Sequence, residues 1–102
     1  MIDFTQSFQV RARSQEEAIV LFNALKENGC RWNSGNELNT SKTNWGIYKG
    51  KTIYDVWCYK RDYGHVLYGC HEDPTCETYD LHEFLQELYG AEEQNLNIES
   101  LL

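Results

Sequence analysis

A helix with clear start and stop signals near the N-terminus is the feature that most constrains the fold of this chain. Ser14 and Glu17 have the spacing of a capping box, in which the Ser14 hydroxyl accepts a bond from a first-turn amide and Glu17 reaches back. Gly29 supplies the left-handed residue that commonly ends a helix. The pattern predicts an amphipathic helix over residues 14–28 with one buried face. Its apolar positions recur at three- and four-residue spacing: Ala18, Leu21, Phe22 and Leu25.

A second helix is marked in the same way near residue 80. Asp80 and Glu83 repeat the capping-box spacing, and Gly90 follows the last apolar position. Tyr79 before the cap and Phe84 four residues into the helix fit a hydrophobic staple. The predicted buried face consists of Leu81, Phe84, Leu85 and Leu88.

Four stretches have the composition or alternation of β-strands. Residues 2–10 place Phe8 and Val10 on one side at period two. Residues 30–43 are polar without a clear period, which indicates a loop with room for one short strand. Three further runs are rich in strand formers: Asn44–Tyr48, Thr52–Tyr59 and His65–Tyr68. We expect Val56 and Leu67 to join Phe8 and Val10 in the core.

The order of these elements is β-α-β-β-β-α, which predicts an α+β fold. We expect an antiparallel sheet of about four strands with two helices packed on one face. A chain of 102 residues buries a single core. We therefore expect a single α+β domain over residues 1–90, followed by an acidic C-terminal tail over residues 91–102.

Charge is divided sharply between the two parts of the chain. All nine Lys and Arg residues lie between Arg11 and Arg61, and the first 61 residues contain six acidic residues, so this part carries +3. The last 41 residues contain ten acidic residues and no Lys or Arg, and therefore carry −10. The overall charge of −7 argues against direct binding to nucleic acid or to an anionic membrane, which requires basic side chains.

An acidic half of this kind suits a partner with a basic surface, and many basic surfaces hold nucleic acid. We therefore expect the partner to be a host protein with a basic nucleic-acid-binding groove, which this chain would occupy as a DNA mimic. The alternative is that the charge serves solubility alone. The candidate partner-binding residues are Glu72, Asp73, Glu77, Glu83, Glu87, Glu92 and Glu93.

Aromatic residues crowd the middle of the chain and support a second hypothesis. Rings displayed beside basic side chains are typical of a platform on which a nucleotide or sugar stacks. An oligomer would place such a pocket at subunit junctions, whereas the alternative is that these rings fill a small core. The candidate ligand-binding residues are Trp32, Trp45, Tyr48, Tyr54, Trp57, Tyr59, Lys60 and Arg61.

Cysteine and histidine residues suggest a metal site that their spacing does not support. Cys70, His71 and Cys76 form the richest cluster, with Cys58, His65 and His82 as further candidate ligands. Cys70 and Cys76 are six residues apart, and no close CxxC pair exists. Cys70 and His71 would point to opposite faces of a strand, so they make a poor catalytic dyad. We expect no metal, no cofactor and no enzymatic activity.

The N-terminus has no basic region followed by an apolar region, and no apolar run reaches about 18 residues. These features predict a cytosolic protein that binds no membrane. Four cysteines in that setting are expected to be free thiols or ligands rather than disulfides.

The segment that follows the first helix reads Gly29-Cys30-Arg31-Trp32-Asn33-Ser34-Gly35. A helix followed by Gly-x-x-Trp-x-Ser-Gly resembles small uncharacterised proteins of bacteriophages, and the similarity covers about residues 4–70. In that pattern an aromatic residue often follows the glycine, where Cys30 stands here. The resemblance implies a phage accessory protein in the host cytoplasm. With the acidic half, it suggests an anti-CRISPR or anti-restriction type inhibitor.

Overall fold

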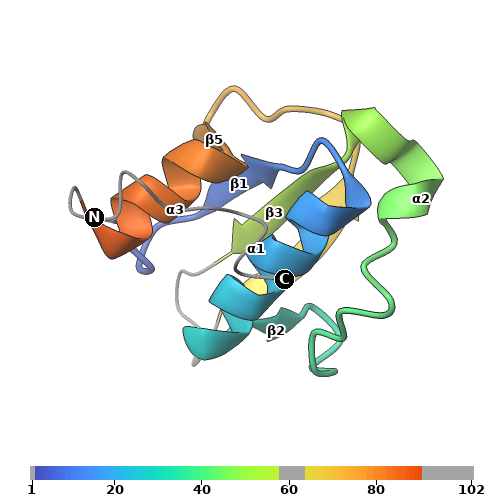
Figure 1. Cartoon of the computed structure of the whole chain (residues 1–102). Helices are drawn as coiled ribbons and strands as arrows, with labels where there is room; N and C mark the ends of the chain where they lie inside the picture. The colour runs from blue at the N-terminus through green and yellow to red at the C-terminus, as the bar shows by residue number, and fades with distance from the viewer. Residues whose placement is uncertain (1, 58–63, 91–102) are drawn as a thin grey trace.

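The computed structural model describes residues 2–57 and 64–90. Two helices, α1 (Gln15–Glu27) and α3 (Leu81–Tyr89), cover one face of a sheet (Figure 1). The described residues contribute five strands to this sheet, in the order β2-β4-β3-β1-β5. The strands are β1 (Phe8–Arg11), β2 (Arg31–Trp32), β3 (Ile53–Trp57), β4 (His65–Gly69) and β5 (Glu77–Asp80).

The α+β class is confirmed, but the expected four-stranded antiparallel sheet is wrong. Strands β1, β3 and β4 pair antiparallel, whereas β5 runs parallel to β1 and β2 runs parallel to β4. Strand β5 escaped prediction because it is short, polar and at the sheet edge, where a strand needs no regular apolar alternation. The predicted tail over residues 91–102 lies outside the described residues.

Both predicted helices are confirmed with their caps. The Ser14 hydroxyl accepts from the Glu17 amide at 3.1 Å, and Glu17 in turn accepts from the Arg13 amide at 3.0 Å. At α3, Glu83 accepts from the Asp80 amide at 2.9 Å. The staple rings of Tyr79 and Phe84 lie 6.5 Å apart between centroids. Local capping signals therefore fixed both helix starts.

No helix among the described residues is long and apolar enough to span a bilayer.

The strand predicted at residues 44–48 is wrong, because this segment forms the one-turn helix α2 (Trp45–Tyr48). A 3-10 turn, Lys49–Lys51, follows it. The Trp45 indole donates to the Ala12 carbonyl at 2.9 Å, and Asn44 has a positive φ of 63°. This tertiary anchor overrides the strand preference of Trp, Ile and Tyr.

The two faces of the sheet have different characters. On the helix face, Phe8, Val10, Tyr54, Val56 and Val66 pack with residues of α1 and α3 in one core. The intervening residues point the other way, because side chains alternate along a strand. Gln9 and Ile53 are on this second face and are only 1% exposed. Leu67 is also there, paired with Asp55, and is half-buried rather than in the helix-side core as predicted. Leu88 is likewise half-buried.

The connection between β4 and β5 covers part of this second face. It leaves β4, bypasses β3 and β1 in the sheet order, and returns at the far edge. Gln9 of β1 accepts from the Asp73 amide of this connection at 3.0 Å. We call residues 70–76 the crossing loop and the face beneath it the loop face.

Candidate functional site

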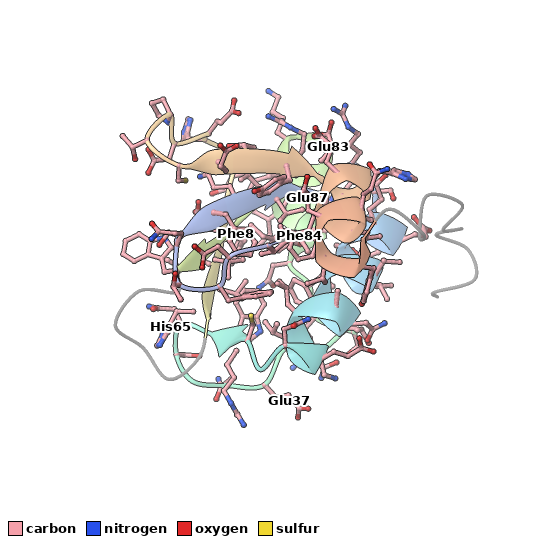
Figure 2. All side chains as sticks on the ribbon, turned by 90° about the vertical axis from the view of Figure 1, so that its left-hand side faces the viewer. Phe8, Glu37, His65, Glu83, Phe84 and Glu87 are labelled. Atoms are coloured by element: carbon pink, nitrogen blue, oxygen red, sulfur yellow. The ribbon has the colours of Figure 1, made fainter. Side chains whose placement is uncertain are left out.

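The structure divides the predicted acidic residues between the two sides of β5. Glu77 shares a side with Tyr79, which packs on Phe84 of the helix face. Glu83 and Glu87 are one turn apart on α3, near the end of β5 (Figure 2). The two remaining described candidates, Glu72 and Asp73, lie in the crossing loop on the other side of β5. We call Glu72, Asp73, Glu77, Glu83 and Glu87 the acidic edge; all five are exposed. Glu92 and Glu93 lie outside the described residues.

The charges of three acidic-edge carboxylates contribute to the raised pKa of the Tyr79 hydroxyl. The pKa of Tyr79 is raised, first by burial and then by the charges of Glu77, Glu87 and Glu83. Because residues from β5 and from α3 both contribute, the folded chain concentrates negative potential at this place.

Basic residues neutralise one end of the acidic edge. Arg13 pairs with Asp80 at 3.0 Å, and Arg11 pairs with Asp80 at 4.0 Å and with Glu72 at 3.7 Å. Such exposed pairs contribute little stability, typically about 0–1 kcal/mol. Arg11 and Arg13 therefore act at the Glu72 and Asp80 end of the acidic edge.

A cavity of about 420 Å³ opens on the loop face where β1 begins and β3 ends. Strand β3 contributes Asp55 and Trp57, and the crossing loop contributes Asp73 and Cys76. Trp57 is 46% exposed. Ser7 and Phe8 also line this cavity, and the Ser7 hydroxyl is buried with no hydrogen-bond partner among the described residues.

Gln9 holds the floor of this cavity together. Its Nε2 donates to Asp55 Oδ1 in a short hydrogen bond. Its Oε1 accepts from the Asp73 amide and from the Thr78 hydroxyl, both at 3.0 Å. One buried side chain therefore joins β1, β3, β5 and the crossing loop.

The cavity is a costly place for negative charge. Burial raises the pKa of Asp55, the bond from Gln9 lowers it, and the charge of Asp73 raises it further. Asp73 differs because it is exposed and accepts from the Thr75 amide and hydroxyl, which lower its pKa. Burial and the charges of Asp73, Asp55 and Glu77 raise the pKa of Cys76. The Cys76 thiol therefore stays protonated at neutral pH and is a poor nucleophile.

The candidate aromatic platform is split among three places. Tyr54 is fully buried and donates to the Thr43 carbonyl at 2.7 Å, and Trp45 packs against the same core. Trp57 lies on the loop face. Trp32 and Tyr48 both contact Tyr68, each with ring centroids 6.1 Å apart. The remaining candidates, Tyr59, Lys60 and Arg61, lie outside the described residues.

The Trp32–Tyr68 pair borders a shallow groove of about 300 Å³ that also contains Asn33, Ser34 and Asn44. The β2–β4 ladder ends here, where the Asn33 amide donates to the Val66 carbonyl at 2.9 Å. Alternate residues of β4 face β2, so the backbone amide and carbonyl of Tyr68 lie beyond the end of β2. The groove combines aromatic rings with amide side chains and a sheet-edge backbone.

The described residues contain no group of three or more His, Cys, Asp or Glu that could hold a metal ion. Cys70 and Cys76 are half-buried thiols in the crossing loop, whereas His71 and His82 are exposed. Cys58 lies outside the described residues.

Comparisons with known protein families, with curated proteins and with solved structures found no significant match.

Sequence reasoning missed Gln9 and Asp55. Gln9 lies between Phe8 and Val10 on a strand, so its position indicates a solvent-facing side chain. Its burial depends on the crossing loop, which comes more than 60 residues later in the chain. The only available signal was the acidic residue Asp55 inside an otherwise apolar and aromatic strand.

Proposed function

We propose that this protein is a non-enzymatic, phage-type accessory protein that binds and inhibits a host nucleic-acid-handling protein. The acidic edge would occupy the basic groove in which the target normally holds nucleic acid. The resemblance of the Gly29–Gly35 segment to phage proteins supports a phage accessory protein that acts in the host cytoplasm. An anti-CRISPR or anti-restriction role fits that context.

The observation that carries this proposal is the placement of Glu77, Glu83 and Glu87 on the adjoining β5 and α3, where burial and then their charges raise the pKa of Tyr79. Carboxylates from a strand and from a helix reinforce one another there, and such a field accelerates association with a basic surface. Tyr79 lies among them, and aromatic residues are enriched in the buried centres of protein interfaces. The raised pKa of Cys76 favours binding over catalysis by that thiol.

The test begins with an acidic-edge variant that carries Glu77→Gln, Glu83→Gln and Glu87→Gln. Wild type and variant are used to capture partners from host lysate, and the captured protein is then purified. We expect wild type to displace DNA or RNA from that target and the acidic-edge variant to bind it at least tenfold more weakly. The association rate of wild type should fall steeply as salt is raised, since exposed charges are screened beyond about 8–10 Å.

A matched control changes the same number of carboxylates elsewhere, with Glu16→Gln, Glu27→Gln and Glu37→Gln. Glu37 lies at the opposite side of the molecule from Glu83 (Figure 2). The control should keep wild-type affinity for the target. Equal weakening by both variants would mean that net charge alone matters. No weakening by either, with binding insensitive to salt, would refute the proposal.

The groove beside Trp32 and Tyr68 supports a second candidate function, the binding of a small nucleotide or sugar. The specific observation is that the Tyr68 backbone lies beyond the end of β2 and beside two aromatic rings. A ring stacked on Tyr68 could hydrogen-bond to this backbone and to Asn33. Thermal-shift measurements with a panel of nucleotides and sugars test this function. Stabilisation that Tyr68→Ala abolishes supports it, and no stabilisation by any member refutes it for that panel.

A further inference from the structure

We propose that the cavity between Asp55, Asp73 and Trp57 receives an arginine side chain of the partner protein. This inference rests on the proposed function, because a basic groove presents arginine side chains. It also makes that function more specific, since it names one chemical group and one receptor site.

The walls of the cavity match the shape of a guanidinium group. Trp57 lines the cavity, is 46% exposed as a residue, and follows Asp55 by two residues on the same face of β3. A planar cation can stack on the indole while its edge faces the carboxylate. The volume of about 420 Å³ is sufficient for a long side chain.

The cavity carries two carboxylates, and the described part of the chain pairs neither of them with a basic side chain. Among residues 2–57 and 64–90, Arg11 and Arg13 pair with Glu72 and Asp80, and no ion pair reaches Asp55 or Asp73. Burial raises the pKa of Asp55, the bond from Gln9 lowers it, and the charge of Asp73 raises it further because the two carboxylates repel each other. A cation placed between them would remove this repulsion and favour the ionised form of Asp55.

The receptor is built before the partner arrives. Gln9 Nε2 donates to Asp55 Oδ1, and Gln9 Oε1 accepts from the Asp73 amide, so neither residue needs to reorganise. Gln9 is itself only 1% exposed, which restricts its own movement. Preorganisation of this kind reduces the entropy lost on binding.

The acceptor atoms of Asp55 and Ser7 suit a group with many donors. Asp55 Oδ2 takes no part in the bond from Gln9, and the buried Ser7 hydroxyl has no partner among the described residues. A guanidinium group has five N–H donors in a planar fork, whereas a lysine ammonium has three on one atom. Arginine therefore fits this cavity better than lysine. A metal ion fits less well, because the described residues offer no group of three ligands.

The direct test titrates the full chain with three blocked peptides, acetyl-Gly-X-Gly-amide, in which X is arginine, lysine or citrulline. Citrulline has nearly the shape of arginine but no charge. The readout is the indole N–H resonance of Trp57 in a nitrogen-15 correlation spectrum, assigned with Trp57→Phe. We expect the arginine peptide to shift this resonance and the citrulline peptide to bind at least tenfold more weakly. Equal shifts by arginine and citrulline would overturn the inference. No shift by the arginine peptide would also overturn it, and a shift by ZnCl₂ or MgCl₂ in a parallel titration would then indicate a metal site.

The second test uses the captured target and the variants Asp55→Asn and Trp57→Ala. We expect each variant to bind the target about tenfold or more weakly, with Trp57→Phe recovering most of the affinity. Circular dichroism confirms that each variant is folded. If the acidic-edge variant weakens binding but Asp55→Asn and Trp57→Ala do not, the arginine receptor is refuted while the proposed function stands. If none of these variants weakens binding, both fail.

Discussion

Replacement of Gln9 by alanine is expected to be among the most destabilising changes on the loop face. Gln9 makes one hydrogen bond to a charged carboxylate and two to neutral groups. Hydrogen bonds to charged groups contribute about 1.5–3 kcal/mol, and neutral ones about 1 kcal/mol each. Their loss predicts that Gln9→Ala lowers the free energy of unfolding by about 4 kcal/mol. That is a large share of the roughly 5–15 kcal/mol that stabilises a typical domain.

Urea denaturation of wild type and Gln9→Ala measures this change, and Gln9→Glu separates its causes. Glu keeps the two acceptor bonds but loses the Nε2 donor and places a second carboxylate against Asp55. We therefore expect Gln9→Glu to be destabilised at neutral pH and to recover in acid, where one proton can be shared between the two carboxyl groups. A loss below about 1 kcal/mol for Gln9→Ala would refute the idea that Gln9 holds the strands and the crossing loop together. A loss in Gln9→Glu that does not change with pH would refute the electrostatic part of the argument.

Asp55, Tyr54 and Phe22 can each be tested by a measurement on the isolated protein. Asp55→Asn should raise the free energy of unfolding at neutral pH, because burial raises the pKa of Asp55 and its ionisation is costly in the folded state. In wild type, the stability contributed by protonated Asp55 is lost as pH rises from the ordinary Asp range through the raised pKa. The urea midpoints of wild type and Asp55→Asn should therefore diverge as pH rises across that range. A constant separation would contradict the assignment. Tyr54→Phe should cost about 1–3 kcal/mol, since it leaves the Thr43 carbonyl without the Tyr54 bond in a buried site, and chemical denaturation checks it. Burial raises the pKa of Tyr54 to about 12, so its absorbance should show no phenolate below pH 10. Phe22→Ala should cost about 3–5 kcal/mol, because Phe22 is fully buried against Trp32 and Tyr54; an unchanged urea midpoint would contradict the core placement.

Local signals predicted the helices well because their information lies within a few residues. Ser14 and Glu17 specify the start of α1, and Asp80 and Glu83 specify the start of α3, independently of the rest of the chain. Strand predictions were less secure because β preference depends on neighbouring strands. The Asn44–Tyr48 segment shows this dependence, since a hydrogen bond to Ala12, 33 residues away, accompanies its helical turn.

The candidate site could be predicted only in part for the same reason. The division of charge identified the acidic residues, but it could not show that β5 would place them on both of its sides. The aromatic residues near residue 57 could not be sorted into core and surface until the faces of β3 were known. Tyr54 and Trp57 are three residues apart and therefore point to opposite faces of the sheet.

The buried surroundings of Asp55 connect stability with the proposed function. A fold selected for stability alone would have no reason to keep two repelling carboxylates beside a cavity, because an amide at residue 55 could still accept the bond from Gln9. Natural proteins commonly retain such costs where binding requires them. The expectation is therefore a pair of opposite effects from one substitution: Asp55→Asn should stabilise the free protein and weaken its complex with the target. Both quantities are measurable on the same preparation, by urea denaturation and by titration with the target. A variant that gains stability and keeps full affinity would show that the Asp55 charge does not serve binding to this partner.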